Sequence, residues 1–133
     1  MIGDTQHERI LIVDDEAQII NMLATYFQRK GYKVNACETG TEAYEKFKEK
    51  PESFSAVITD VTMPDISGLE LAEKIIKINS KVPIIMMTGF SCGEIKFPDT
   101  IEAVFFKPLS VIALHKKVQE VIKNRKESSL VLQ

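Results

Sequence analysis

The sequence predicts a single α/β domain, built as a doubly wound sheet of five parallel strands with helices on both faces. Short continuous apolar runs, which are typical of strands buried on both faces, alternate along the chain with apolar stripes of helical period. The loops between these segments are short, and 133 residues are enough for one domain with a sizeable core. Strands and helices that alternate in this way form parallel sheets, because each crossover helix packs back onto one face.

Five apolar runs are the predicted strands. The first, RILIV, is apolar after its first residue, and the fourth tolerates Pro83 only because the proline stands near the start of the strand. The strands are expected over residues 9–13, 32–37, 55–60, 82–88 and 102–106.

Helices are predicted where apolar residues recur at intervals of three and four. Gly31 ends the first helix, and Pro51 ends the second, which is expected over about residues 41–50. The apolar stripes consist of Ile20, Leu23, Ala24 and Phe27, then Ala43, Tyr44 and Phe47, then Leu69, Ala72, Ile75 and Ile76, and finally Val111, Leu114, Val118 and Val121.

Two segments depart from this regular alternation. Residues 89–100 should hold a fourth helix, but Gly89, Gly93 and Pro98 weaken it, so a short or irregular helix is expected there. The tail over residues 126–133 is expected to fray.

Composition excludes several functional classes. The net charge is −2, which gives no sign of direct nucleic-acid binding. Cys37 and Cys92 form neither a disulfide framework nor a metal-ligand pair, so two free thiols in a reducing compartment are expected. The first ten residues contain no apolar signal core, and no apolar run approaches the roughly 20 residues of a membrane helix. A cytoplasmic domain without membrane contact is predicted.

Polar side chains stand at the ends of four predicted strands. The first strand ends at Asp14 and Asp15, the third at Asp60, the fourth at Thr88 and the fifth at Lys107. Ligands of such sheets bind beyond the carboxyl ends of the strands, so these residues should meet at one edge. Three carboxylates suit a hard cation such as Mg²⁺, and a lysine with a hydroxyl suits the oxygens of a phosphoryl group. One carboxylate can act as a nucleophile and become an acyl phosphate.

Each of these residues also has an ordinary structural interpretation. Asp14 and Asp15 can be a helix N-cap and first turn, where negative charge suits the helix dipole. Asp60 and Thr88 can be loop or cap residues, and Lys107 can be a solvated surface lysine. The joint pattern favours a site, because these independent explanations would all have to coincide at one sheet edge.

Four motifs, ILIVDDE, VITDVTMPDISGLELAEKI, PIIMMTG and FFKPL, resemble the receiver domain of bacterial response regulators in their order and spacing, over about residues 8–124. The resemblance implies a flavodoxin-like sheet with strand order 2-1-3-4-5. It also implies a phosphoacceptor of a two-component phosphorelay, which exchanges a phosphoryl group with a histidine kinase or phosphotransfer protein and then switches its interaction with an effector. Such a domain catalyses only its own phosphorylation and dephosphorylation. The receiver domain is expected over residues 9–124, after an extension over 1–8 and before a tail or linker stub over 125–133.

The resemblance assigns a role to each acidic residue. Asp60 would accept the phosphoryl group and also bind Mg²⁺. Asp15 would be a direct metal ligand, Asp14 would hold the metal largely through water, and the backbone carbonyl of Thr62 would complete the ligands. Glu16 is assigned to the first helical turn, where its charge suits the dipole.

Lys107 would pair with Asp60 and later with the phosphoryl group, and Thr88 would swing to hydrogen-bond that group. The peptide bond before Pro108 is a candidate for the cis form. Relatives often carry a switching aromatic three residues before the lysine, but Val104 stands there. Strand alternation turns Phe106 to the same face as Val104, so an aromatic switch at that position is unavailable.

Other positions bear on output and phosphoryl lifetime. The segment over residues 89–106 has only 18 residues and is shorter by about one helical turn than the resemblance implies. This shortening affects the face that an effector would read. Thr62 and Phe90 occupy the positions that tune dephosphorylation, and we hypothesise that Phe90 shields the acyl phosphate from water.

Two other functions fit parts of the pattern. A phosphatase with an aspartyl nucleophile usually carries a second Asp two residues after the nucleophile, but this chain has Thr62 at that position. Turnover of a small phosphate ester would favour the phosphatase over the receiver domain. A non-phosphorylated interaction module would have a vestigial site. The complete set of acidic, hydroxyl and lysine residues argues against this function. The chain could be a stand-alone regulator or a receiver from a longer protein such as a hybrid kinase.

Overall fold

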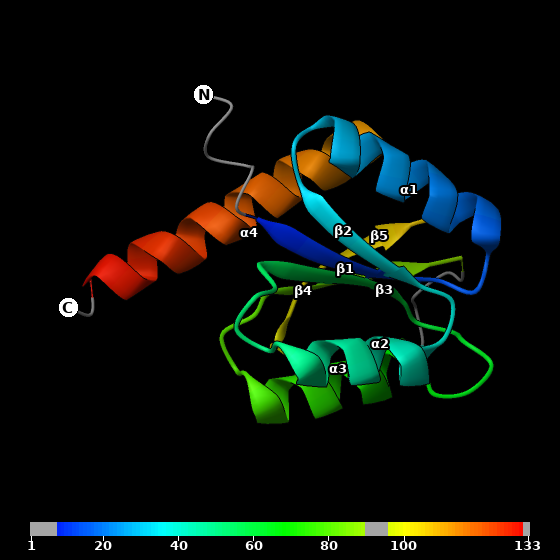
Figure 1. Cartoon of the computed structure of the whole chain (residues 1–133), viewed down its shortest axis with the longest axis horizontal. Coiled ribbons are helices and arrows are strands. Elements are labelled where there is room, and N and C mark those ends of the chain that lie inside the picture. The colour runs from blue at the N-terminus through cyan, green and yellow to red at the C-terminus, as the bar shows by residue number, and fades with distance from the viewer. Residues whose placement is uncertain (1–7, 90–95, 132–133) are drawn as a thin grey trace.

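The computed structural model describes residues 8–89 and 96–131 and places a five-stranded parallel sheet between two pairs of helices (Figure 1). The strand order is β2-β1-β3-β4-β5, which confirms the predicted topology. In chain order the elements are β1 (Arg9–Val13), α1 (Ala17–Arg29), β2 (Lys33–Cys37), α2 (Gly40–Glu49), β3 (Ala56–Asp60), α3 (Gly68–Ile78), β4 (Ile84–Thr88), β5 (Ile101–Phe106) and α4 (Val111–Val131).

The position of each strand in the sheet follows its composition. β3 and β4 are buried along their whole length, and β1 is buried from its second residue onward, as expected for apolar runs covered on both faces. The edge strands β2 and β5 carry polar residues such as Lys33, Asn35 and Glu102 and are only partly buried. The most apolar strands therefore occupy the centre, and β3, which ends at Asp60, lies in the middle of the sheet.

Two apolar cores lie on opposite faces of the sheet. Alternation along β1 sends Ile10 and Ile12 to one face and Leu11 and Val13 to the other. Helices α1 and α4 cover the first face, and α2 and α3 cover the second (Figure 1). Among the largest fully buried side chains are Phe27, Leu23, Phe47, Leu71 and Ile75, all from these helices.

Helix ends follow local chemistry. Gly31 has a φ of 98°, which glycine adopts readily, and it ends the turn after α1. The hydroxyls of Thr39 and Ser67 accept hydrogen bonds from the third amides of α2 and α3, at 3.1 Å each. Ser110 accepts one from the amide of Ala113 at 3.2 Å and begins α4.

Two predicted features differ in detail from the structure. Most of the predicted fourth helix, residues 90–95, lies outside the described residues, and residues 96–100 form a loop and a turn instead of a helix. The predicted frayed tail is wrong up to Val131, because α4 continues without a break to that residue. Nothing in the sequence over 123–131 breaks a helix, since neither Gly nor Pro occurs there.

None of the helices within residues 8–89 and 96–131 has the length and apolar character needed to cross a membrane.

Candidate phosphoacceptor site

The site lies at the edge formed by the carboxyl ends of the strands. Asp14 follows β1, Asp60 is the last residue of β3, and Lys107 follows β5. The parallel register pairs β1 with β3, and β3 with β4, so the ends of these strands come together although they are far apart in the chain. The structure thus brings together residues from three strands that the sequence analysis expected to meet.

Lys107 is the centre of this cluster. Its ammonium nitrogen Nζ lies 2.8 Å from Asp14 Oδ2, 2.9 Å from Asp60 Oδ2 and 2.9 Å from Glu16 Oε1. The ammonium donates hydrogen bonds to Asp60 and Glu16, whereas its contact with Asp14 Oδ2 is an ion pair. The lysine side chain is only 14% exposed, against 60% for Glu16, so the cluster faces water mainly on the Glu16 side.

The other oxygens of the two buried carboxylates are held by backbone amides. The amide of Glu16 donates to Asp14 Oδ1 at 2.9 Å, and the amide of Thr62 donates to Asp60 Oδ1 at 3.2 Å. Asp14 and Asp60 are therefore oriented from both sides, by an amide and by Lys107. Asp15 is exposed beside them.

Burial and charge oppose each other in the cluster. Burial raises the pKa of Asp14 above its ordinary value and the nearby Asp60 adds to this, while bonds from Lys107 and from the Glu16 amide act in the opposite direction. Burial alone would lower the pKa of Lys107, but its bonds to Asp14, Asp60 and Glu16 outweigh burial and raise it. Lys107 is thus held firmly as a cation by the acids around it.

The acidic residues fit a divalent cation. One carboxylate oxygen from each of Asp14, Asp15 and Asp60 lies within 4.8 Å of the others. An all-oxygen set with two partly fixed carboxylates is the type of site that suits a hard ion such as Mg²⁺.

Gly68 forms the support beneath Asp60. Its amide donates to the carbonyl of Val61 at 2.8 Å, and a Cβ at this position would lie 2.0 Å from the backbone oxygen of Asp60. Only glycine permits this approach, so the first residue of α3 packs directly against the end of β3.

Two other predicted residues, Thr88 and Pro108, also lie at this edge. Thr88 ends β4, is fully buried, and accepts a hydrogen bond from the amide of Lys107 to its carbonyl at 2.8 Å. The peptide bond between Lys107 and Pro108 is cis. Val104 is turned to the α2–α3 face and packs against that core, while Phe106, two residues later, is 53% exposed. Phe90 lies outside the described residues.

Sequence reasoning missed two residues here. Glu16 was assigned to the first turn of α1, but it is the N-cap residue, its side chain makes no cap bond, and its carboxylate pairs with Lys107. Asp65, in the loop after β3, accepts the amides of Gly40 and Thr41 at 3.1 and 2.7 Å and so caps α2 from outside. The sequence signal for Asp65 is only an acid within the loop motif, because its partner is 24 residues away in the chain.

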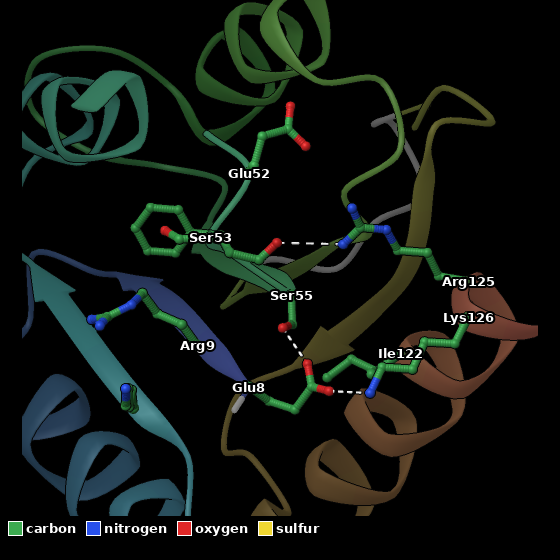
Figure 2. Close-up of a pocket in the computed structure, with 10 residues that line it drawn as sticks. Glu8, Arg9, Glu52, Ser53, Ser55, Ile122, Arg125 and Lys126 are labelled. Atoms are coloured by element: carbon green, nitrogen blue, oxygen red, sulfur yellow. Dashed lines mark hydrogen bonds and ion pairs between the residues drawn. The ribbon is translucent and has the colours of Figure 1, made fainter. Parts of the chain in front are cut away.

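A separate cavity of about 790 Å³ lies at the opposite edge of the sheet, between the starts of β1 and β3 and residues 122–126 of α4 (Figure 2). Glu8 accepts a hydrogen bond from Ser55 and forms an ion pair with Lys126. Arg125 donates a hydrogen bond to the carbonyl of Phe54 at 3.4 Å. None of the predicted site residues lines this cavity, and its contacts hold the end of α4 against the sheet.

Comparison with known proteins agrees with this geometry. The family model of the response regulator receiver domain matches residues 10–119. Response regulator receiver protein CpdR of Brucella abortus is 34% identical over 93 residues, covering 70% of this chain and 75% of that protein. Regulatory protein VanRB of Enterococcus faecalis is 31% identical over 118 residues, covering 86% of this chain but 52% of that protein, so the chain spans about half of its length.

A solved structure is similar over most of the chain. Response regulator protein TrrA of Thermotoga maritima, in complex with Mg²⁺ and BeF, is 34% identical with a TM-score of 0.77, covering 86% of this chain and 98% of that chain. The fold, the acidic cluster and the family model agree, and the chain belongs to the response regulator receiver domain family.

Proposed function

We propose that Asp60 accepts a phosphoryl group from the phosphohistidine of a histidine kinase or phosphotransfer protein, with Mg²⁺ bound at the acidic cluster. One observation carries this proposal. Asp60 ends the central strand with Lys107 at 2.9 Å, and with oxygens of Asp14 and Asp15 within the 4.8 Å cluster. A nucleophile, a cation and a metal-binding set thus meet at one point.

The transfer needs little from the protein beyond position and charge. A carboxylate oxygen of Asp60 attacks phosphorus, the P–N bond to the histidine breaks, and its electron pair leaves with the imidazole nitrogen, which takes a proton. The product is an acyl phosphate on Asp60. Lys107 then turns to the phosphoryl oxygens, and the Thr88 hydroxyl donates a hydrogen bond to one of them.

The acids beside Asp60 serve the same reaction. Asp14, Asp15, Asp60 and the carbonyl of Thr62 would hold Mg²⁺, which when bound neutralises charge on the phosphoryl oxygens. Phosphorylation adds about −1.5 to −2 charges to an already acidic edge. The loops that carry Thr88 and Lys107 therefore shift, and an effector protein reads the shifted surface.

We place this exchange in the cytoplasm, where reducing conditions suit the buried free thiol of Cys37. The domain acts as a switch and turns over no separate substrate. Its partners are the phosphoryl donor and the effector, and it contacts neither nucleic acid nor membrane directly.

Acetyl phosphate with Mg²⁺ tests the proposal without a kinase. Intact mass spectrometry should show one added phosphoryl group on the wild type and none on Asp60→Asn, whose amide is a poor nucleophile. Wild type without Mg²⁺ should gain much less. If wild type and Asp60→Asn both stay unmodified, the site is a vestigial one in an interaction module, and steady release of phosphate from a small ester would instead indicate a phosphatase.

A further inference from the structure

Glu16 is the one member of the Lys107 cluster that has no part in the proposed chemistry. Its carboxylate lies 2.9 Å from Lys107 Nζ, yet it is outside the acidic group whose oxygens fit a cation. Its side chain makes no bond to the amides of α1, although it stands at the N-cap. The observed contact with Lys107 is therefore what the Glu16 side chain does in this fold.

The positions of the three acids around Lys107 differ in a way that matters for the metal. The side chains of Asp14 and Asp60 are 0% and 9% exposed and belong to the metal-binding set, whereas Glu16 is 60% exposed and does not. A cation that binds Asp14 and Asp60 competes with the ammonium for their oxygens. Lys107 can give up those oxygens at low cost only if another carboxylate stays beside it.

We propose that Glu16 is a positioning residue that keeps Lys107 paired while Mg²⁺ takes the oxygens of Asp14 and Asp60, and so strengthens Mg²⁺ binding through the lysine. This inference rests on the proposed function, because it concerns the same metal. Without the Glu16 carboxylate, the ammonium depends on Asp14 and Asp60 alone and competes more strongly with the metal.

Isothermal titration calorimetry of the unphosphorylated protein with MgCl₂ measures the effect directly. Glu16→Gln should weaken Mg²⁺ binding about tenfold, the low end for partners of a metal-ligand set, because water screens this exposed side chain. Glu16→Asp keeps the charge but is one methylene shorter, so its carboxylate falls short of Lys107. It should weaken binding nearly as much.

A double-mutant cycle with Lys107→Met separates the contact from simple charge. If Glu16 acts through the lysine, Glu16→Gln should change Mg²⁺ affinity little once Lys107 is Met. Wild-type affinity in Glu16→Gln or in Glu16→Asp, or an undiminished Glu16→Gln effect in the Lys107→Met protein, would overturn the inference while leaving the proposed function intact. A wild type that binds no Mg²⁺ would overturn both.

Discussion

Cys37 ends β2 as a buried thiol, and its burial has a chemical consequence. Its side chain is 2% exposed, and burial raises the pKa of the thiol to about 12. Because the thiolate is the reactive form, the folded protein should protect this residue at neutral pH.

Iodoacetamide labelling followed by peptide mapping checks this protection. The peptide that contains Cys37 should stay unmodified in the native protein. In urea it should be labelled within minutes, because the unfolded thiol has an ordinary pKa of about 8.5. Reading only that peptide keeps the result independent of Cys92. Rapid native labelling of Cys37 would contradict its burial at the end of β2.

Single residues also show what the sequence could and could not predict about the site. Asp14, Asp60 and Lys107 were predictable, because strand ends of a parallel sheet converge whatever the details of packing. Glu16 was not predictable, because its contact depends on the reach of two long side chains from segments 91 residues apart. Sequence spacing carries information on backbone placement, but not on which way a flexible side chain turns.

The loop between β3 and α3 is fastened at its far end by Asp65. The carboxylate binds the first two amides of α2, and hydrogen bonds from Thr41 in particular hold the pKa of Asp65 well below its usual range. In Asp65→Asn, one acceptor oxygen of the side chain becomes an NH₂ donor that faces a backbone N–H of α2. The protein should therefore lose about 1 kcal/mol of stability near neutral pH.

The pH dependence has a definite sign. Since the folded carboxyl has a lowered pKa, its stabilisation is complete above the ordinary value of 3.8 and is lost as pH falls through and below that value. Urea unfolding should therefore show wild type more stable than Asp65→Asn at pH 7, with the gap narrowing toward about pH 3.5. A gap that stays constant or widens on acidification would contradict the assignment of this carboxylate as the cap.

The start of α3 packs too closely on β3 to admit a side chain. In Gly68→Ala the new Cβ would meet the backbone oxygen of Asp60 at 2.0 Å, and backbone cannot move as a flexible side chain does. We expect a loss of about 1–3 kcal/mol in urea unfolding, together with slower phosphorylation because Asp60 is displaced.

Gly89→Ala is the matched control for Gly68→Ala. No described atom lies within 4 Å of the Cβ position at Gly89, so its stability should stay near that of the wild type. Equal losses for the two variants would show that the contact with Asp60 does not explain the effect, because the entropy change of the unfolded chain favours alanine over glycine and would stabilise both variants.

At the scale of elements, the five strands and four helices of residues 8–89 and 96–131 were predictable to within a few residues, because their apolar periods are clear. The region from residue 89 to 100 was harder, since Gly89, Gly93 and Pro98 weaken a helix without saying what replaces it. The last turns of α4 were missed for the opposite reason. Residues 125–131 lack an apolar stripe, but their helical propensity and the contacts of Arg125 and Lys126 continue the helix.

The whole molecule should fold without the last turns of α4. The helix packs on the sheet through Leu114, Val118, Val121 and Ile122, all of which precede Asn124. A chain ending at Asn124 should unfold in one cooperative step in urea, with unchanged phosphorylation of Asp60. It should lose about 1–3 kcal/mol, because the buried Glu8 would lose Lys126 as its cation.

A second truncation, after Ser128, supplies the control because it keeps both Arg125 and Lys126. It should match the full chain in stability. Loss of cooperative unfolding in the chain that ends at Asn124 would place the boundary of the receiver domain later than residue 124.

The strand order shows the limit of reasoning from pattern alone. Alternation of strands and helices, with right-handed crossovers, predicts a doubly wound parallel sheet but leaves several strand orders open. The order 2-1-3-4-5 came from the motif resemblance, and the structure confirms it. Burial gives the physical reason, because it places the most apolar strands in the middle.

The uninterrupted run of α4 to Val131 has a geometric consequence for protein engineering. The helix leaves the sheet on the side away from the acidic edge (Figure 1). A reporter domain joined in continuous helix after residue 131 would be held by a stiff helical connection. Each residue inserted in the junction would rotate the reporter by about 100° about the helix axis. Signal transmission to such a reporter should rise and fall with a period of about 3.6 inserted residues, so the helical phase of the junction becomes a design variable in its own right.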